Sequence, residues 1–355
     1  MAEDNPVPVP HALFQKLIII LRAILPFRVL QDQSGIWQYL YDHSFTACAI
    51  LITLASYLVT VLILKNRFYQ NWQKMYGKKV YFYAWLAAIG LLLLNPILLF
   101  TLKDRLILGY IPANVWHNPT YVLMRPFALW LFFFILDYWD KKLNVKQSLL
   151  IAFISYLLVF AKPNFTLSII PALAIFYSLK KRLFKSWNWS LIAPLLIPSL
   201  LGLFYEYWFM TLYPTESRFF FAPLVSALYY AGNIHFLMLL LFLSITFPVL
   251  LTLLDWKSII KDSGFQLACL NFAIALLTFL LFTELPHIAM LNFSWGAVMA
   301  VFILFVVCIN HLILNYSELK KHFWKKSLLL GSLSLHLVSG IVYTILSIVQ
   351  AGPVR

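Results

Sequence analysis

Polar side chains able to do chemistry gather in three short segments between apolar runs. The first segment, 109–121 (GYIPANVWHNPTY), places Asn114, Trp116, His117 and Asn118 close together and contains two prolines. Asparagine and histidine in a loop stiffened by proline can hydrogen-bond to hydroxyl groups or to phosphate. The alternative interpretation is a rigid turn that carries an interfacial tryptophan.

The second segment is Lys162-Pro163-Asn164, which separates the apolar runs 148–161 and 165–179. An ionisable residue at membrane depth is a candidate functional residue, because burying a charge in lipid is costly. The Lys162 ammonium group suits a phosphate or diphosphate, with Asn164 beside it. The alternative is a lysine at a helix end whose charged head reaches water.

The third segment contains Glu284 and His287, followed by Asn292 and Trp295. A carboxylate and an imidazole three residues apart could act as an acid/base pair. Their spacing differs from that of helical zinc motifs, so no metal site is predicted. The alternative is ordinary loop polarity at the end of a membrane span.

Charged residues in the other outer segments are weaker candidates, since each alone is typical of a solvated loop. They are Asp32 and Asp42 in 31–44, and Glu206, Glu216 and Arg218 in 206–233. Residues near the ends or interiors of spans are interpreted as packing or as polar contacts between helices: Asp137, His311 and His336.

The composition identifies the class of protein that must position these residues. Of 355 residues, 62% are hydrophobic and 11% are charged, whereas soluble domains have about 25% charged residues. The net charge of +14 comes from lysines and arginines in short loops between apolar runs. This is the positive-inside pattern of membrane proteins, and it argues against a nucleic-acid partner. The three cysteines lie in apolar runs and predict neither a disulfide framework nor a metal site.

Apolar runs predict an all-α, polytopic transmembrane bundle of about nine to ten spans, including a hairpin of two short helices. The tip of that hairpin, at Lys162, lies within the protein or at the outer leaflet. Residues 11–30 carry three cations, which indicates an interfacial helix or a tilted first span. Residues 1–44 then form a tail, this helix and a short outer loop, and 45–350 form the transmembrane domain. The predicted spans are 45–64, 80–101, 121–139, 148–161, 165–179, 188–205, 234–254, 265–283, 293–314 and 327–349.

Three motifs resemble the GT-C superfamily of polytopic membrane glycosyltransferases and related bacterial cell-envelope proteins. The resemblance covers about residues 40–315. The motifs are Asn-Val-Trp-His-Asn-Pro-Thr at 114–120 with Arg-Pro-Phe-Ala at 125–128, Ala-Lys-Pro-Asn-Phe at 161–165 with Pro-Ala at 171–172, and Glu284 with Leu-Asn-Phe-Ser-Trp-Gly at 291–296.

The resemblance implies a transferase that moves a sugar from a polyprenyl-phosphate donor to a glycan, lipid or protein acceptor. It implies a multi-pass protein of the bacterial inner membrane that acts in polysaccharide biosynthesis at the outer face. In that superfamily the catalytic carboxylate lies in the first large outer loop, which points to Asp32 or Asp42. Here that connection, 31–44, is short, so Glu284 stands as an alternative base.

The sequence therefore predicts that the three polar segments converge on one outward-facing cavity that binds the lipid phosphate and the sugar. A second interpretation is a transporter, a flippase or an assembly subunit for lipid-linked envelope glycans. Neither interpretation predicts a cofactor, although both are compatible with a divalent metal. The expected catalytic residues are Asp32, Asp42 and Glu284, and the expected substrate-binding residues are Asn114, Trp116, His117, Asn118, Lys162, Asn164, Arg218, His287, Asn292 and Trp295.

Overall fold

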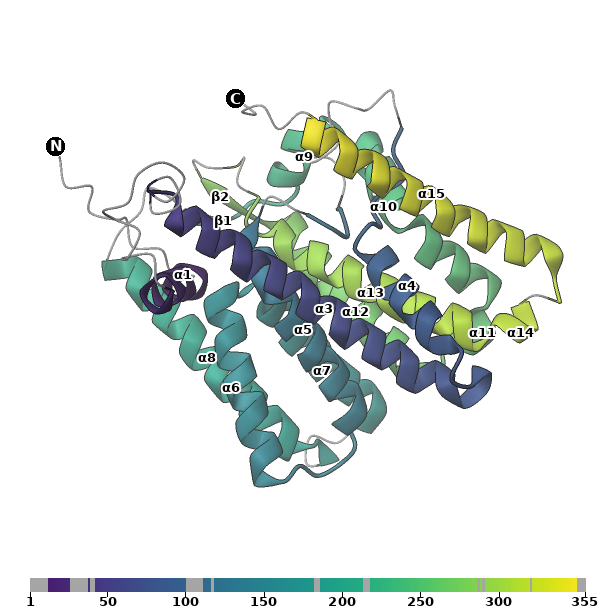
Figure 1. Cartoon of the computed structure of the whole chain (residues 1–355), viewed down its shortest axis with the longest axis horizontal. Coiled ribbons are helices and arrows are strands. Elements are labelled where there is room, and N and C mark those ends of the chain that lie inside the picture. Colours follow the sequence, from purple (N-terminus) through teal and green to yellow (C-terminus); the bar gives the residue numbers. More distant parts are fainter. Residues whose placement is uncertain are drawn as a thin grey trace. The chain divides into compact units, whose positions relative to one another are not determined.

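The computed structural model describes residues 12–25, 38, 42–99, 111–115, 118–181, 186–212, 218–285, 288, 291–319 and 321–349. These residues are mostly helical, with one pair of short strands (Figure 1). Seven of the described helices are long and apolar enough to cross a membrane. A helical, multi-pass membrane protein is thereby confirmed.

The seven candidate spans are α3 (Ser44–Tyr76), α5 (Pro119–Tyr138), α8 (Trp189–Leu212), α10 (Ile234–Leu254), α12 (Ser263–Leu281), α13 (Ser294–Leu314) and α15 (Phe323–Val349). The remaining helices are α1 (Leu13–Ile24), α4 (Val80–Leu91), α6 (Val145–Ala161), α7 (Asn164–Lys181), α9 (Val225–Ala231), α11 (Trp256–Ile259) and α14 (Tyr316–Leu319). The strands are β1 (Arg218–Phe221) and β2 (Phe282–Leu285).

Some helix boundaries match the sequence-based prediction closely. Helix α10 coincides with the predicted span, and the Asn233 side chain caps it by accepting a hydrogen bond from the Phe236 N–H at 2.9 Å. The predicted break between two short apolar helices is also present, because α6 ends at Ala161 and α7 begins at Asn164.

Several segments differ from the sequence-based prediction. Helix α3 continues to Tyr76, beyond the predicted span 45–64, and two short strands are present in a fold predicted to be all-α. Helix α4 ends at Leu91, so the segment 80–101 does not form the continuous span that its apolar composition predicted. Helix α8 continues to Leu212, through residues that were expected to start an outer loop. Helix α1 has 12 residues, a length of about 18 Å against a hydrocarbon core of about 30 Å. Its length favours the interfacial alternative.

The chain divides into two compact units. Unit 1 comprises 1–60, 116–166 and 188–215, and unit 2 comprises 61–115, 167–187 and 216–355. Within unit 1, α6 packs along α8 and against α5, and α1 contacts both α5 and α6 (Figure 1). These contacts enclose the side chains of α5, whose most apolar stretch is 67% buried.

Within unit 2, α13 is the central helix, and 83% of its most apolar stretch is buried. It packs along α12 and against α10, and α10 also contacts α15. Strands β1 and β2 pair antiparallel, with Arg218 opposite Leu285. This pairing joins the segment after α8 to the segment after α12.

Unit 2 contains a non-helical segment, 94–99, inserted between apolar helices. Backbone without helical hydrogen bonds is tolerated at membrane depth only when other groups satisfy it. Here α10 and α15 supply those groups. The Asn95 N–H donates a hydrogen bond to the His336 carbonyl (3.2 Å), and the Ile97 N–H donates to the Leu243 carbonyl (3.1 Å). The Leu98 N–H donates to Ser339 Oγ (3.0 Å).

His336 joins this segment to α10 through both of its ring nitrogens. Its Nδ1 lies 2.7 Å from the Asn95 carbonyl oxygen, and its Nε2 accepts a hydrogen bond from the Phe247 N–H at 3.3 Å. The pattern matches a neutral imidazole with the proton on Nδ1. The fully buried His336 is thus a packing residue, as its position inside an apolar run suggested.

The N-terminus of α12 depends on Asp262. Its Oδ1 accepts hydrogen bonds from the backbone N–H groups of Gly264 (2.7 Å) and Phe265 (3.2 Å). Burial alone would raise the pKa of the Asp262 carboxyl. The His311 imidazole, 3.9 Å away, and the two backbone N–H groups outweigh burial and hold that pKa below its usual range.

Replacement of Asp262 by alanine is expected to lower the free energy of unfolding by about 1 kcal/mol at pH 7, because two N–H groups lose their acceptor. A depressed carboxyl pKa stabilises the fold above the unfolded-state value, near 3.9, and that stabilisation is lost as pH falls through the folded-state value. The difference in apparent Tm between wild type and D262A should therefore shrink below about pH 4. Glu318→Gln is the control, because its ion pair with Lys321 is exposed. A gap that persists in acid would contradict this account.

Candidate functional site

Among the described residues of unit 1, three charged side chains are buried. Arg125 on α5 is fully buried, Lys162 between α6 and α7 is 4% exposed, and Glu206 on α8 is 5% exposed. Burying a charge is unfavourable unless other charges or hydrogen-bonding groups compensate it. The three residues therefore identify the part of unit 1 where the fold keeps polar chemistry inside an apolar structure.

Proline places Lys162 at the break between the two helices. Because Pro163 disfavours helical backbone in the residue before it, Lys162 has extended backbone (φ −172°, ψ 117°) and ends α6, while its N–H still donates to the Leu158 carbonyl at 3.0 Å. The side chain then reaches α5, and its Nζ donates to Thr120 Oγ1 at 3.4 Å. The break thus brings an ammonium group to the first turn of another helix.

Asn118 organises that first turn of α5. Its Oδ1 accepts hydrogen bonds from the Tyr121 N–H at 3.0 Å and from Thr120 Oγ1 at 2.8 Å. Pro119 occupies the first helical position, where no N–H is needed. Lys162, Thr120 and Asn118 therefore form one hydrogen-bonded chain at the positive end of a helix dipole.

Arg125 lies further along α5, between two tyrosine rings. Its guanidinium carbon is 5.0 Å from the centroid of the Tyr121 ring and 5.3 Å from that of Tyr57 on α3. Cation–π contacts of this kind stabilise a guanidinium group that has lost its water. A guanidinium group also has a planar fork of N–H donors, whose geometry suits bidentate recognition of a phosphate.

Glu206 supplies the negative charge of the cluster. Its carboxylate is close enough to Lys162 for their charges to interact. The sequence analysis interpreted Glu206 as a solvated loop charge, and the structure corrects this because α8 continues past it. The signal was the unbroken run of aromatic residues around it, 204–209, which continues the helix. With Arg125 and Lys162, the three buried side chains carry a formal charge of +1, which favours an anionic ligand.

The predicted residues of unit 2 lie around the two strands. Glu284 on β2 is 8% exposed, and its carboxylate accepts a hydrogen bond from the Asn292 side-chain amide. Trp295 is buried at the start of α13, whereas Arg218 on β1 is exposed. The structure therefore brings together Glu284 and Asn292 of this predicted set. His287 lies outside the described residues.

The segment 109–121 is shared between the units. In unit 2, Asn114 Nδ2 donates to the carbonyls of Leu91 (2.7 Å) and Leu94 (2.8 Å). These contacts cap the end of α4, so the structure gives Asn114 a supporting role there. In unit 1, Asn118 serves α5 as described above. Trp116 and His117 lie outside the described residues, and their roles stay predictions.

Of the two carboxylates proposed for the first outer loop, the structure describes Asp42. It is exposed two residues before the start of α3, and it accepts a hydrogen bond from the Gln38 side chain at 2.9 Å. Asp32 lies outside the described residues. Asn164 begins α7 next to Lys162, in unit 1. Catalysis by either aspartate and the convergence of all three segments stay predictions.

His311 makes polar contacts, in agreement with the sequence analysis, but its partners Asp255 and Asp262 in unit 2 were not predicted. His311 on α13 places Nε2 2.7 Å from Asp255 Oδ2, while Asp262 lies on its other side. The sequence signal for these contacts was the position of Asp255 and Asp262 on either side of the short helix α11. This spacing places both aspartates at one end of α12 and α13. Within the described chain, no group of three such side chains is arranged to hold a metal ion.

Comparison of the chain with models of known protein families, with curated proteins and with solved structures gave no match. The resemblance to membrane glycosyltransferases therefore rests on the sequence motifs alone.

Proposed function

We propose that the protein is a GT-C-like membrane glycosyltransferase that binds the phosphate of a polyprenyl-phosphate sugar donor in unit 1. The observation that carries the proposal is the presence in unit 1 of two buried cations, Arg125 and Lys162, and of the buried carboxylate of Glu206, which interacts with Lys162. A lipid phosphate would neutralise the remaining positive charge within an apolar surrounding. A neutral lipid alcohol would leave that charge uncompensated.

The two cations suit different parts of phosphate recognition. Arg125 offers a planar set of donors, which can bind two oxygens of one phosphate. Lys162 offers a compact charge at the start of α5, where the helix dipole also favours an anion. Both would bind the phosphate more strongly once sugar transfer has left it with an additional negative charge. This difference between ground state and transition state is what accelerates a reaction.

The reaction would form one bond and break one bond at the anomeric carbon. An acceptor hydroxyl oxygen attacks that carbon, the bond from carbon to phosphate oxygen breaks, and polyprenyl phosphate leaves. A carboxylate takes the hydroxyl proton. Asp32, Asp42 and Glu284 are the proposed bases, and Glu284 is the one of these held in a buried hydrogen bond within the described residues. His117 and Asn118 would bind the sugar.

A second candidate function, a transporter or flippase for lipid-linked glycans, has one observation in its favour. The sequence shows one interrupted hairpin, but unit 2 contains two further interruptions. These are the non-helical segment 94–99 and the kink in α10 at Ile245 (φ −129°, ψ 21°). Interrupted helices are typical of substrate sites in secondary transporters.

The proposal is tested with purified full-length protein in lipid nanodiscs. Native mass spectrometry should show polyprenyl phosphate binding at least about tenfold more tightly than polyprenol of the same length, because the neutral alcohol lacks the charge. Equal binding of the two lipids would contradict the phosphate site. Incubation with polyprenyl-phosphate hexoses and an acceptor should release polyprenyl phosphate. Movement of intact donor across vesicles, without that release, would favour the transporter.

A further inference from the structure

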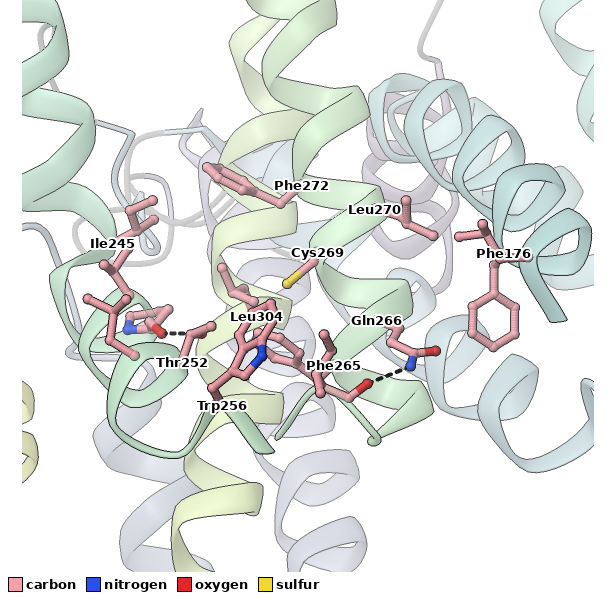
Figure 2. A pocket seen from close by; sticks show the side chains of 15 residues that line it. Phe176, Ile245, Thr252, Trp256, Phe265, Gln266, Cys269, Leu270, Phe272 and Leu304 are labelled. Carbon is pink, nitrogen blue, oxygen red and sulfur yellow. Dashed lines mark hydrogen bonds between the residues drawn. The ribbon is translucent and has the colours of Figure 1, made fainter. Parts of the chain in front are cut away.

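Unit 2 has an apolar pocket that none of the predicted site residues lines (Figure 2). Its volume is about 490 Å³, within the range of about 300–1,000 Å³ found for ligand pockets. Helices α7, α10, α12 and α13 form its walls. Figure 2 shows Cys269 and Phe272 on one wall, Ile245 and Thr252 on another, and Phe176 at the side.

Local structure explains why the pocket is open. Helix α10 loses its regular backbone at Ile245 and contains Pro248, and both residues line the cavity. The kink keeps that part of α10 from packing closely on α12. The polar groups are largely satisfied within the wall, since Thr252 Oγ1 donates to the Pro248 carbonyl (2.7 Å) and Gln266 Nε2 donates to the Ile260 carbonyl (2.6 Å). The interior therefore suits a hydrocarbon.

Three lysines lie next to residues that line the pocket, one by a side-chain contact and two by their position in the chain. Lys180 Nζ lies 5.6 Å from the ring of Phe176, a wall residue. Lys257 directly follows Trp256, and Lys261 directly follows Ile260, both of which also line the pocket. All three lysines are exposed. The positive-inside rule places these three lysines on the cytoplasmic side of the membrane.

Asp255 and Asp262 lie near these lysines in the chain, but they do not fully neutralise the positive charge of the lysines. Asp255 is held by His311 Nε2 at 2.7 Å, and Asp262 caps α12 through two backbone N–H groups. Their carboxylates are thus engaged inside unit 2. An apolar pocket with lysines at its cytoplasmic rim matches a lipid that has a hydrocarbon tail and an anionic head.

We propose that this pocket binds one acyl chain of an anionic glycerophospholipid of the cytoplasmic leaflet, whose phosphate contacts Lys180, Lys257 and Lys261. The tail lies between α10 and α12, and Trp256, 55% exposed, lies at the level of the headgroup. This site is independent of the proposed donor site in unit 1. It would attach unit 2 to a negatively charged leaflet.

The test uses the full-length protein and native mass spectrometry with added phosphatidylglycerol or phosphatidylcholine. Wild type should retain one phosphatidylglycerol molecule at least about tenfold better than phosphatidylcholine. The double substitution Lys257→Gln and Lys261→Gln should weaken phosphatidylglycerol binding by about 10–30-fold, since two cationic contacts are lost. Lys78→Gln with Lys79→Gln is the matched control, because both lysines are exposed elsewhere in unit 2. It should have no such effect.

A substitution that fills the pocket tests whether the acyl chain of the lipid lies there. Cys269→Phe places a ring in the cavity and should abolish the retained lipid, whereas Leu277→Phe, on an exposed face of the same helix outside the pocket, should not. If Cys269→Phe fails to fold, the lysine variants still decide the matter, because their side chains are exposed. Equal retention of both phospholipids, unchanged binding in the lysine and pocket variants, or displacement of phosphatidylglycerol by equimolar polyprenyl phosphate would overturn the proposal.

Discussion

Gly340→Ala is expected to destabilise the protein by about 3 kcal/mol or more, beyond the usual range for overpacking. A Cβ atom on Gly340 of α15 would lie 1.5 Å from the Leu93 carbonyl oxygen and 3.1 Å from the Asn95 nitrogen. Both atoms belong to backbone that cannot rotate away as a side chain can. The variant should lose several degrees in apparent Tm, measured by thermal unfolding in detergent, and should accumulate poorly in cells.

The same helix provides the control. A Cβ atom on Gly331 would meet no atom within 4 Å. Gly331→Ala should therefore be neutral, or stabilising by up to about 1 kcal/mol, because alanine favours helix more than glycine does. If the two variants unfold at the same temperature, α15 does not pack as closely on the 94–99 segment as the structure indicates.

Loss of sugar transfer is the largest functional effect expected, and Lys162 is the residue to test. Replacing it by methionine should reduce transfer by about 100–1,000-fold, the effect of removing one donor from a developing negative charge. The same variant leaves Glu206 buried without its cationic neighbour, which should also destabilise the fold. Activity and stability therefore have to be separated.

A double variant separates them. Lys162→Met combined with Glu206→Gln removes both charges of the Lys162–Glu206 pair, so it should regain much of the stability lost by Lys162→Met while staying inactive. Lys146→Met is the matched control, because Lys146 is exposed on the adjoining helix α6. Recovery of transfer in the double variant would mean that Lys162 supports the fold and takes no part in binding phosphate.

Glu284→Gln tests the general base in the same assay. It should lower transfer by at least about 100-fold, because an amide cannot accept the proton of the acceptor hydroxyl. The amide can still bond to Asn292, so the fold should be retained. Normal turnover of this variant would leave Asp32 or Asp42 as the proposed base.

The fold was predictable wherever apolar runs are long and their ends carry polar signals. Asn233 and Asp262 mark the first turns of α10 and α12 in the sequence as they do in the structure. The run 80–101 was misleading because composition alone cannot distinguish a helix from a buried, non-helical segment. Its hydrogen-bond partners, among them His336 and Ser339, lie far away in the chain.

The candidate site was predictable to a similar extent. Lys162 drew attention because a charge and a proline interrupt two apolar runs, and it is buried as a functional lysine would be. Its contacts with Thr120 and Glu206 were not readable, since they depend on how α5, α6 and α8 pack in unit 1. Glu206 in particular looked like a loop residue because the end of a helix is hard to locate within aromatic sequence.

The buried 94–99 segment also constrains the order in which the chain can be assembled in the membrane. The Leu98 N–H finds its acceptor on Ser339, 241 positions later in the chain. At about 5–20 residues per second, a ribosome needs on the order of 10–50 s to make that stretch. Throughout that time water, the insertion machinery or a chaperone must satisfy this backbone. Helix α15 therefore completes a part of the protein that was synthesised much earlier.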